Sequence, residues 1–455
     1  MAAIPSQEKI TIKNETGEKG NYLIPLILVT SLFFLWGLAN SLNGSLIKQF
    51  QIALDLSRFQ AGVIDFAFYM GYFFMALPAG YFMKKYGYKK GIILGLLLYA
   101  TGAFLFYPAA SMREYSFFLF ALFTIASGLA FLETAANLYV TVLGDPDKAE
   151  WRINFAQSFN GISLVLGPII GALFIFSPIE YSREALASLS VAEAEQIRIQ
   201  EALSVQPPYL AIGSLVLFVT LLFAFTKMPD VGEAESAGSK KISIISLFRH
   251  KHLTSGIIAQ FLNVGAQTVL WGYFVDFKLD FAREAHWALA EGYMHIINSI
   301  TGVKTVLTST QIAGYHASFA LVLFLLGRFI GTTLMSRFAA SRVLLWFSTG
   351  ATIFIVLAML TGGLTAVICL SLTYFCQSIM FPTIFALATK GLGVESKLAS
   401  SLLIMSIVGG AIMPMIAGAL FKFGPSYALI VPLVCFGYVV FFAAKGSQIK
   451  EFVKA

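Results

Sequence analysis

The sequence has few charged residues and few cysteines. Lys, Arg, Asp and Glu make up 12% of its 455 residues, about half the share found in an average soluble domain. The three cysteines, Cys369, Cys376 and Cys435, all lie in apolar stretches, so we interpret them as packing residues rather than as a disulfide framework. Because 58% of the residues are hydrophobic, the composition excludes a disordered chain, a coiled coil and an ordinary soluble enzyme.

Signatures of enzyme and cofactor sites are also missing from the sequence. There is no P-loop, no CxxC, no HExxH and no GxSxG in a strand-turn-helix context. No run of Lys and Arg with interleaved aromatic residues occurs, so the net charge of +7 does not indicate nucleic-acid binding. We therefore predict no enzymatic activity, no catalytic residue, no metal and no cofactor. Any active transport must then use an ion gradient or a partner.

Long apolar runs are what the sequence has in abundance. About twenty apolar residues can cross a bilayer as a helix, and continuous rather than alternating runs favour helices over a β-barrel. Such runs lie at 22–47, 59–82, 90–108, 114–140, 151–176, 206–227, 251–277, 313–336, 342–361, 363–389, 397–422 and 425–445. They predict an all-α membrane protein with about twelve transmembrane helices.

A polar stretch between the sixth and seventh runs divides the chain near its middle. The division predicts two six-helix bundles, a layout typical of transporters whose site lies between the bundles. The predicted parts are a tail (1–21), a first bundle (22–227), a linker (228–250), a second bundle (251–445) and a tail (446–455).

The basic residues of the loops predict the orientation. They cluster in the loops after the second, fourth, eighth and tenth runs and in the linker, whereas the long loop 177–205 on the opposite side is mainly acidic. Positive charge marks cytoplasmic loops. We therefore expect a multi-pass protein of the bacterial inner membrane with the linker and both termini in the cytoplasm, and we expect a monomer.

Glu133 is the strongest candidate for proton chemistry. It lies well inside the fourth run, and Asn137 follows four residues later on the same helix face. A carboxyl in a partly apolar cavity can hold and release a proton near neutral pH, so we predict a proton-coupling role. The alternative is a carboxyl at a hydrated helix end or one held by another helix.

Amide and aromatic side chains within the runs are candidate sugar ligands. Amides can exchange hydrogen bonds with hydroxyl groups, and an indole can stack on the apolar face of a sugar ring. Each amide pair could equally connect helices in the membrane. The predicted set is Trp36, Asn40, Asn43, Asn137, Gln157, Asn160, Asn263, Gln267, Trp271 and Tyr273.

Two further charged residues lie inside apolar runs. Asp65, a turn into the second run, is a candidate second proton-coupling group or a hydrated residue near the helix end. Arg328 is the one base well inside the eighth run, and for it we favour a structural role, as an ion pair or a snorkelling side chain.

Several segments together resemble a known family. The segment Gly80-Tyr-Phe-Met-Lys-Lys-Tyr-Gly-Tyr-Lys-Lys90 resembles the signature between the second and third helices of the major facilitator superfamily, with Lys84 where Asp is usual. More specifically, the chain resembles the fucose-galactose-glucose:proton symporter family and, within it, the L-fucose permeases. The matching stretches are Ser31–Trp36, Ala67–Tyr72, Leu132–Asn137, Ala156–Asn160, Val264–Thr268 and Phe381–Phe385.

This resemblance implies the major facilitator fold, alternating access and proton-driven sugar uptake. It implies that Glu133 is the proton-linked carboxyl of the fourth helix, and that Gln157 and Asn160 are polar cavity residues of the fifth. Two positions depart from the family pattern. Gly44 follows Leu42 and Asn43 where the family has an Asp, and Asp65 lies where the permeases have an amide. We hypothesise that Asp65 partly replaces the missing carboxyl; otherwise Glu133 suffices alone, or sugar moves without a proton.

We therefore predict a secondary transporter that imports a monosaccharide, L-fucose first, by proton symport. Its partners would be the sugar, the proton and the lipid bilayer. The alternatives are a glucose, galactose or N-acetylglucosamine transporter of the same family, with or without proton coupling, and a sugar sensor that binds without transport.

Overall fold

The computed structural model describes residues 23–54, 58–174, 189–228, 244–282, 295, 298–299, 302 and 309–448. Within these ranges, the side chains of 42–53, 58–62, 65, 168–174, 309–312, 315 and 394 are outside the description. The described chain is helical and contains no strand. Eleven of its helical segments are long and apolar enough to cross a membrane.

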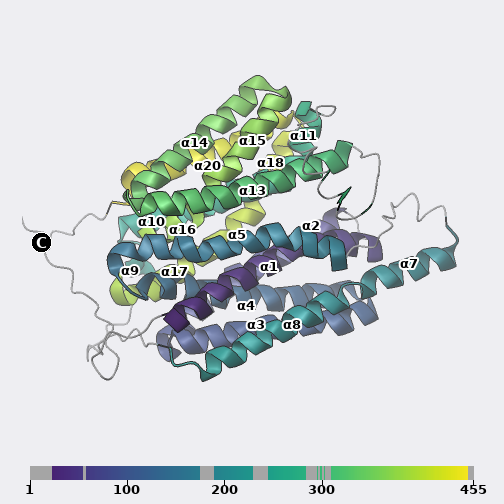
Figure 1. Cartoon of the computed structure of the whole chain (residues 1–455), viewed down its shortest axis with the longest axis horizontal. Coiled ribbons are helices and arrows are strands. Elements are labelled where there is room, and N and C mark those ends of the chain that lie inside the picture. The colour runs from purple at the N-terminus through teal and green to yellow at the C-terminus, as the bar shows by residue number, and fades with distance from the viewer. Residues whose placement is uncertain are drawn as a thin grey trace, which may run out of the picture.

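The first half of the chain forms one layer of long helices (Figure 1). α3 packs on α4 and α8, α1 packs on α5, and α2 packs on α4. The helices are α1 (Leu23–Ala53), α2 (Arg58–Tyr86), α3 (Tyr88–Met112), α4 (Tyr115–Val142), α5 (Ala149–Phe174) and α8 (Gln206–Phe225). α5 is not among the eleven apolar segments, but its 26 residues are long enough to span.

The second half forms the facing layer in Figure 1. Here α10 packs on α18 and α20, and α15 packs on α13 and α14. The helices are α9 (Ile244–Leu247), α10 (Lys251–Gly272), α11 (Phe274–Ala282), α13 (Ser309–Met335), α14 (Ala340–Thr361), α15 (Gly363–Gln377), α16 (Met380–Thr389), α17 (Ser396–Met405), α18 (Gly409–Phe421), α19 (Pro425–Ala428) and α20 (Ile430–Phe441).

Several predicted runs are interrupted within the membrane segment. The run 363–389 is divided into α15 and α16, and the run 397–422 into α17 and α18, joined by a short 3₁₀ turn. Pro382 follows the first break, and proline cannot donate the helical hydrogen bond. The apolar pattern predicts the span but not such a break, because hydropathy does not report local winding.

The loop predicted at 177–205 is wrong in part, because α7 (Val191–Leu203) lies within it. Its start is a capping box in which Ser190 and Glu193 satisfy each other's backbone amides. Glu195 of α7 pairs with Arg113 at the end of α3. Glu193, Glu195 and Glu201 therefore belong to a helix rather than to a loop.

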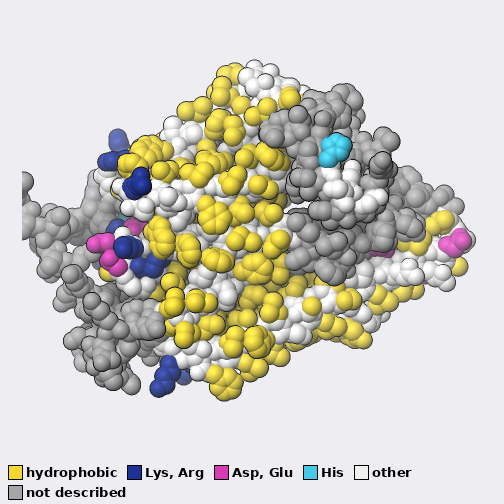
Figure 2. All heavy atoms as spheres, viewed as in Figure 1, with side chains coloured by type: hydrophobic (Ala, Val, Ile, Leu, Met, Phe, Trp, Pro, Cys, Tyr) yellow, Lys and Arg dark blue, Asp and Glu magenta, His cyan; other side chains and the backbone are white. Residues whose placement is uncertain are grey.

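A broad band of hydrophobic side chains covers the middle of the surface in Figure 2. Exposed apolar residues on the transmembrane helices include Phe74, Leu97, Phe120, Phe218 and Leu360. Such a surface is stable only against lipid. The three cysteines are free and buried, which confirms that they are packing residues rather than a disulfide framework.

One end of the molecule carries the loop lysines and arginines (Figure 2). We call it the basic end, and it is formed by the C-terminus of α2, the start of α5 and the turn between α16 and α17, with Lys84, Lys85, Glu150 and Lys390. At this end the two halves contact each other closely. α17 packs on α2 and α4, and α16 packs on α5.

Polar contacts fasten the halves at the basic end. Lys390 Nζ lies 2.7 Å from Glu150 Oε1, Asn154 Nδ2 donates to Thr383 Oγ1 at 3.1 Å, and Ser400 Oγ donates to the carbonyl of Thr134 at 2.8 Å. Each bond joins one half to the other. The described structure is therefore closed at the basic end.

Candidate functional site

A cavity of about 480 Å³ lies between the two halves, beyond the closed basic end. Helices α1, α2, α4 and α5 form one wall, and α10, α13, α15 and α16 form much of the other. The lining residues are Trp36, Asn40, Ser41, Phe68, Tyr69, Tyr72, Glu133, Gln157, Asn160, Leu164, Val264, Gln267, Thr268, Trp271, Gly272, Ala317, Leu321, Phe324, Arg328, Tyr374, Phe381 and Ile407.

Glu133 is the only carboxyl among these lining residues. It projects from α4 and is 5% exposed. Tyr72, on α2, donates its hydroxyl to Glu133 Oε1 at 2.6 Å. A buried carboxyl with one hydrogen-bond donor beside it, facing a cavity, is suited to accept and release a proton.

Asn160 and Trp36 join α5 to α1 at the cavity wall. With its amide oxygen directed at α1, Asn160 accepts a hydrogen bond from Trp36 Nε1 at 2.9 Å. The two helices approach closely because Gly37 has no side chain; a Cβ there would collide with Ser163 Oγ. This contact holds the indole of Trp36 in place in the wall.

Gln157 links three helices around the cavity floor. Its Nε2 donates to Asn137 Oδ1 on α4 at 3.2 Å, and its backbone carbonyl accepts from Arg328 Nη1 on α13 at 2.6 Å. Arg328 also donates from Nε to the carbonyl of Ser378 at 2.7 Å, and its guanidinium lies over the Phe324 ring at 4.5 Å. Within the described residues Arg328 has no carboxylate partner, and it is only 3% exposed. It therefore shows neither the ion pair nor the snorkelling side chain that we expected.

The second half contributes aromatic rings and hydroxyls to the opposite wall. Trp271 stacks on Tyr374 with ring centroids 5.7 Å apart and packs edge-on against Phe324. Its indole nitrogen has no hydrogen-bond partner among the described residues. Thr268 Oγ1 lies 3.4 Å from the hydroxyl of Tyr69 across the cavity.

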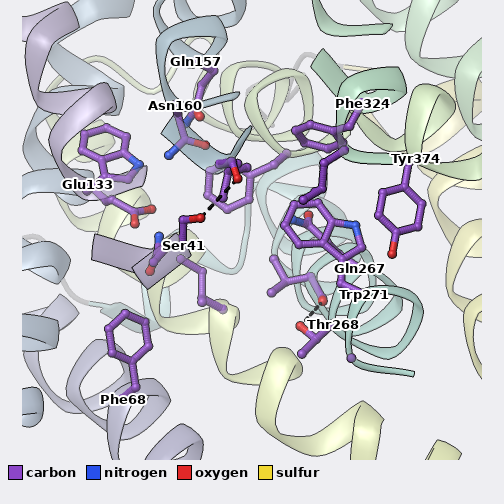
Figure 3. Close-up of a pocket in the computed structure, with 18 of the residues that line it drawn as sticks. Ser41, Phe68, Glu133, Gln157, Asn160, Gln267, Thr268, Trp271, Phe324 and Tyr374 are labelled. Atoms are coloured by element: carbon purple, nitrogen blue, oxygen red, sulfur yellow. Dashed lines mark hydrogen bonds between the residues drawn. The ribbon is translucent and has the colours of Figure 1, made fainter. Parts of the chain in front are cut away.

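Figure 3 shows how the predicted residues are arranged. Glu133 and Asn160 lie on one side of the cavity, and Gln267 and Trp271 lie on the other. Seven predicted residues line the cavity: Trp36, Asn40, Glu133, Gln157, Asn160, Gln267 and Trp271.

The other predicted residues are placed differently. Asn137 and Asn263 are fully buried and do not line the cavity. Tyr273 also lies outside it, because α10 ends at Gly272 and the Tyr273 hydroxyl turns to the carbonyl of Pro414 at 3.3 Å. The side chains of Asn43 and Asp65 are outside the described residues.

Sequence reasoning missed several lining residues, above all Tyr69, Tyr72, Thr268, Phe324 and Tyr374. Tyr69 and Tyr72 are three residues apart and therefore share a helix face, a spacing that could have indicated the site. The others are common residues in membrane helices, and their role depends on which helices meet.

The cavity therefore combines one carboxyl, several amides and hydroxyls, and stacked aromatic rings. Amides and hydroxyls can bind the hydroxyl groups of a sugar, and indole faces can cover its apolar side. The volume falls within the range of about 300–1,000 Å³ that is common for small-molecule sites.

Comparison with known proteins finds one transporter family. The family model of the Major Facilitator Superfamily matches residues 29–392. The chain is 38% identical to the L-fucose-proton symporter of Escherichia coli, over 98% of each chain. It is 35% identical to the glucose/galactose transporter of Brucella abortus, over 96% of this chain and 97% of that one.

A solved structure supports the same assignment. The crystal structure of FucP, a major facilitator superfamily transporter in the outward conformation, superposes with a TM-score of 0.82 at 38% identity, covering 94% of this chain and 99% of that one. The predicted fold, with two helical bundles, is confirmed. The chain belongs to the major facilitator superfamily, in the family that contains the L-fucose-proton symporters and the bacterial glucose/galactose transporters.

Proposed function

We propose that this protein imports a monosaccharide, L-fucose first, together with a proton, by alternating access between its two halves. The observation that carries the proposal is the cavity between the halves, with Glu133 in one wall and Trp271 in the other. The names of the Escherichia coli and Haemophilus influenzae relatives, both L-fucose-proton symporters, support the choice of sugar. A transporter rather than an enzyme is the function consistent with these relatives.

In this mechanism Glu133 takes up a proton from the end opposite the basic end. The sugar then binds to Gln157, Asn160 and Gln267 and stacks on Trp36 or Trp271. The halves rock, the basic end opens, and sugar and proton leave there. One charge that moves down 100 mV provides about 2.3 kcal/mol, enough to concentrate a neutral sugar roughly fifty-fold.

Because Gly44 replaces the carboxyl of the family pattern, the residue that couples transport to protons has to be identified. Glu133 is the one carboxyl among the described residues that line the cavity, so we propose that it is the principal coupling group. We further propose that Asp65 on α2 partly replaces the acid that the family pattern has at Gly44; its side chain is outside the described residues. If Asp65→Asn transports at an unchanged rate and with an unchanged pH dependence, this part of the proposal is wrong.

Glucose or galactose is the second candidate substrate, because other relatives are named for these sugars. Transporters named for glucose and galactose in Brucella abortus and Helicobacter pylori are 35% and 36% identical to this chain. Glucose and galactose therefore stand directly behind L-fucose, with N-acetylglucosamine after them.

We propose that the basic end faces the cytoplasm, with both termini and the linker on that side, and that the protein works as a monomer. The lysines at this end support the orientation through the positive-inside rule. A cysteine introduced at exposed Lys422 at the opposite end should react with an impermeant thiol reagent in intact cells, whereas one at Lys84 should not.

The function is tested by uptake into proteoliposomes with a panel of labelled monosaccharides and an external pH electrode. We expect one sugar to enter and the external medium to become alkaline at the same time. Sugar flux without proton movement would contradict symport but leave the transporter assignment intact. Binding of a sugar without flux would indicate a sensor.

A further inference from the structure

A layer of buried amides lies directly beneath the cavity, on the side of the basic end. We call it the amide layer, and it comprises Asn137, Asn154, Gln260 and Asn263. Asn137 is one turn beyond Glu133 on α4, and Asn154 is one turn before Gln157 on α5. Gln260 and Asn263 precede Gln267 on one face of α10. Helix direction places all four between the cavity and the basic end.

All four amides are fully buried and have unpaired atoms. Each side chain has an exposed fraction of 0%. Asn137 Nδ2, Asn154 Oδ1 and both polar atoms of Gln260 and Asn263 have no hydrogen-bond partner among the described residues. The layer therefore holds six polar atoms without a partner among the described residues, and both halves of the molecule contribute them.

Unpaired amides inside a membrane protein are costly, and leucine or alanine would fill the same space without that cost. Helix-to-helix connection accounts for one polar atom of Asn137 and one of Asn154. It does not account for Gln260 and Asn263, since neither side chain makes such a bond among the described residues in this conformation. The cost disappears if the layer becomes accessible in another conformation.

The contacts around the layer show when it would become accessible. Asn154 donates to Thr383 Oγ1 of the other half at 3.1 Å. Just below it, Glu150 pairs with Lys390 across the halves. Both contacts join the two halves, so opening of the basic end would separate Asn154 from Thr383 and Glu150 from Lys390.

We propose that the amide layer is a second binding site for the hydroxyl groups of the sugar, formed when the basic end opens and used as the sugar leaves. This inference rests on the proposed transport function. It assigns the predicted sugar ligands Asn137 and Asn263 to the exit step rather than to the cavity. It also adds Asn154 and Gln260 to the residues that bind sugar.

The test compares sugar affinity from the two sides in oriented membrane vesicles that contain Gln260→Met or Asn263→Leu. Both substitutions keep the approximate size and remove the amide. For labelled L-fucose presented at the basic end, we expect the half-saturating concentration to rise about five- to tenfold, the loss of one or two hydrogen bonds. For L-fucose presented at the opposite end, it should change less than about twofold.

The control is Gln206→Met, which removes an exposed amide at the start of α8 that bonds to Ser111. It should alter neither value. Equal changes from both sides, or none, would overturn the proposal. A variant that only stabilises the closed basic end would instead bind L-fucose more tightly from the opposite end. That result would also contradict a binding site in the amide layer.

A second measurement does not depend on affinity. Gln260→Cys is labelled with a thiol reagent added at the basic end, and the unchanged protein, whose three cysteines are buried, is the reference. We expect labelling that L-fucose slows. A purely structural amide predicts no labelling, or labelling that sugar does not affect.

The experiments distinguish failure of the transport function from failure of the second site. If no sugar in the panel crosses the membrane, the proposed function is wrong. If L-fucose is transported while the amide variants keep their affinity at the basic end and Gln260→Cys is not protected, only the second site is wrong.

Discussion

At the scale of single residues, proton coupling rests on Glu133. Glu133→Gln keeps the size of the side chain but cannot release a proton, so sugar-driven alkalinisation and accumulation against a gradient should be lost. Exchange of labelled for unlabelled sugar should persist, because exchange needs no net proton movement. Glu195→Gln, which alters an acid of α7 paired with Arg113, serves as the control and should accumulate sugar normally. Accumulation by Glu133→Gln would refute the coupling role.

Tyr72 is the residue that holds the Glu133 carboxyl by a hydrogen bond of 2.6 Å. Hydrogen bonds to charged groups contribute about 1.5–3 kcal/mol, so Tyr72→Phe should slow uptake at least tenfold and change its pH dependence, while sugar binding weakens far less. Tyr427→Phe, at an exposed position, is the matched control. An unchanged pH profile of uptake in Tyr72→Phe would mean that Tyr72 only packs against α4.

At the scale of elements, α2 and α17 meet at Gly80. A Cβ at Gly80 would collide with Ser401 Oγ of the other half, so Gly80→Val should wedge the basic end open. Gly437→Val carries the same change on α20, where nothing lies within 4 Å of the added Cβ. Thiol labelling of Gln260→Cys from the basic end should rise when Gly80→Val is added and should not rise when Gly437→Val is added. Equal labelling in both variants would show that the close approach of α2 and α17 does not hold the basic end closed.

The ion pair of Glu150 and Lys390 joins α5 to the end of α16. It is 2.7 Å long, and the Lys390 side chain is 47% exposed, so the pair contributes no more than about 1 kcal/mol. Either Glu150→Gln or Lys390→Met should therefore favour the open basic end about fivefold at most. The charge-reversed pair Glu150→Lys with Lys390→Glu should restore the original distribution, measured by the same labelling. If the reversed pair behaves like the single variants, the ion pair does not stabilise the closed basic end.

At the scale of the whole molecule, import with one proton makes each cycle electrogenic. A potential of 100 mV alone, set with potassium and valinomycin at equal pH, should then drive accumulation of about fifty-fold. Equilibration of sugar to equal concentrations under that potential would show that the carrier is uncoupled, as Gly44 allows.

The sequence alone determined that this is a helical membrane protein with two halves. Long apolar runs need lipid or a protein interior whatever their neighbours are, so composition was sufficient for the class of fold. Isolated polar residues in those runs were also informative, because each is costly in lipid. Glu133, Gln157, Asn160 and Gln267 were found in this way, and all four line the cavity.

Only the tertiary structure decided which polar residues share one cavity. Asn263 and Gln267 are four residues apart on α10, yet Gln267 lines the cavity and Asn263 is buried below it. Tyr273 turns away because α10 ends just before it. Tyr72 reaches Glu133 from another helix, 61 positions earlier in the chain. Spacing along one helix specifies a face, whereas depth and partners depend on how separate helices pack, and that information is distributed over the whole chain.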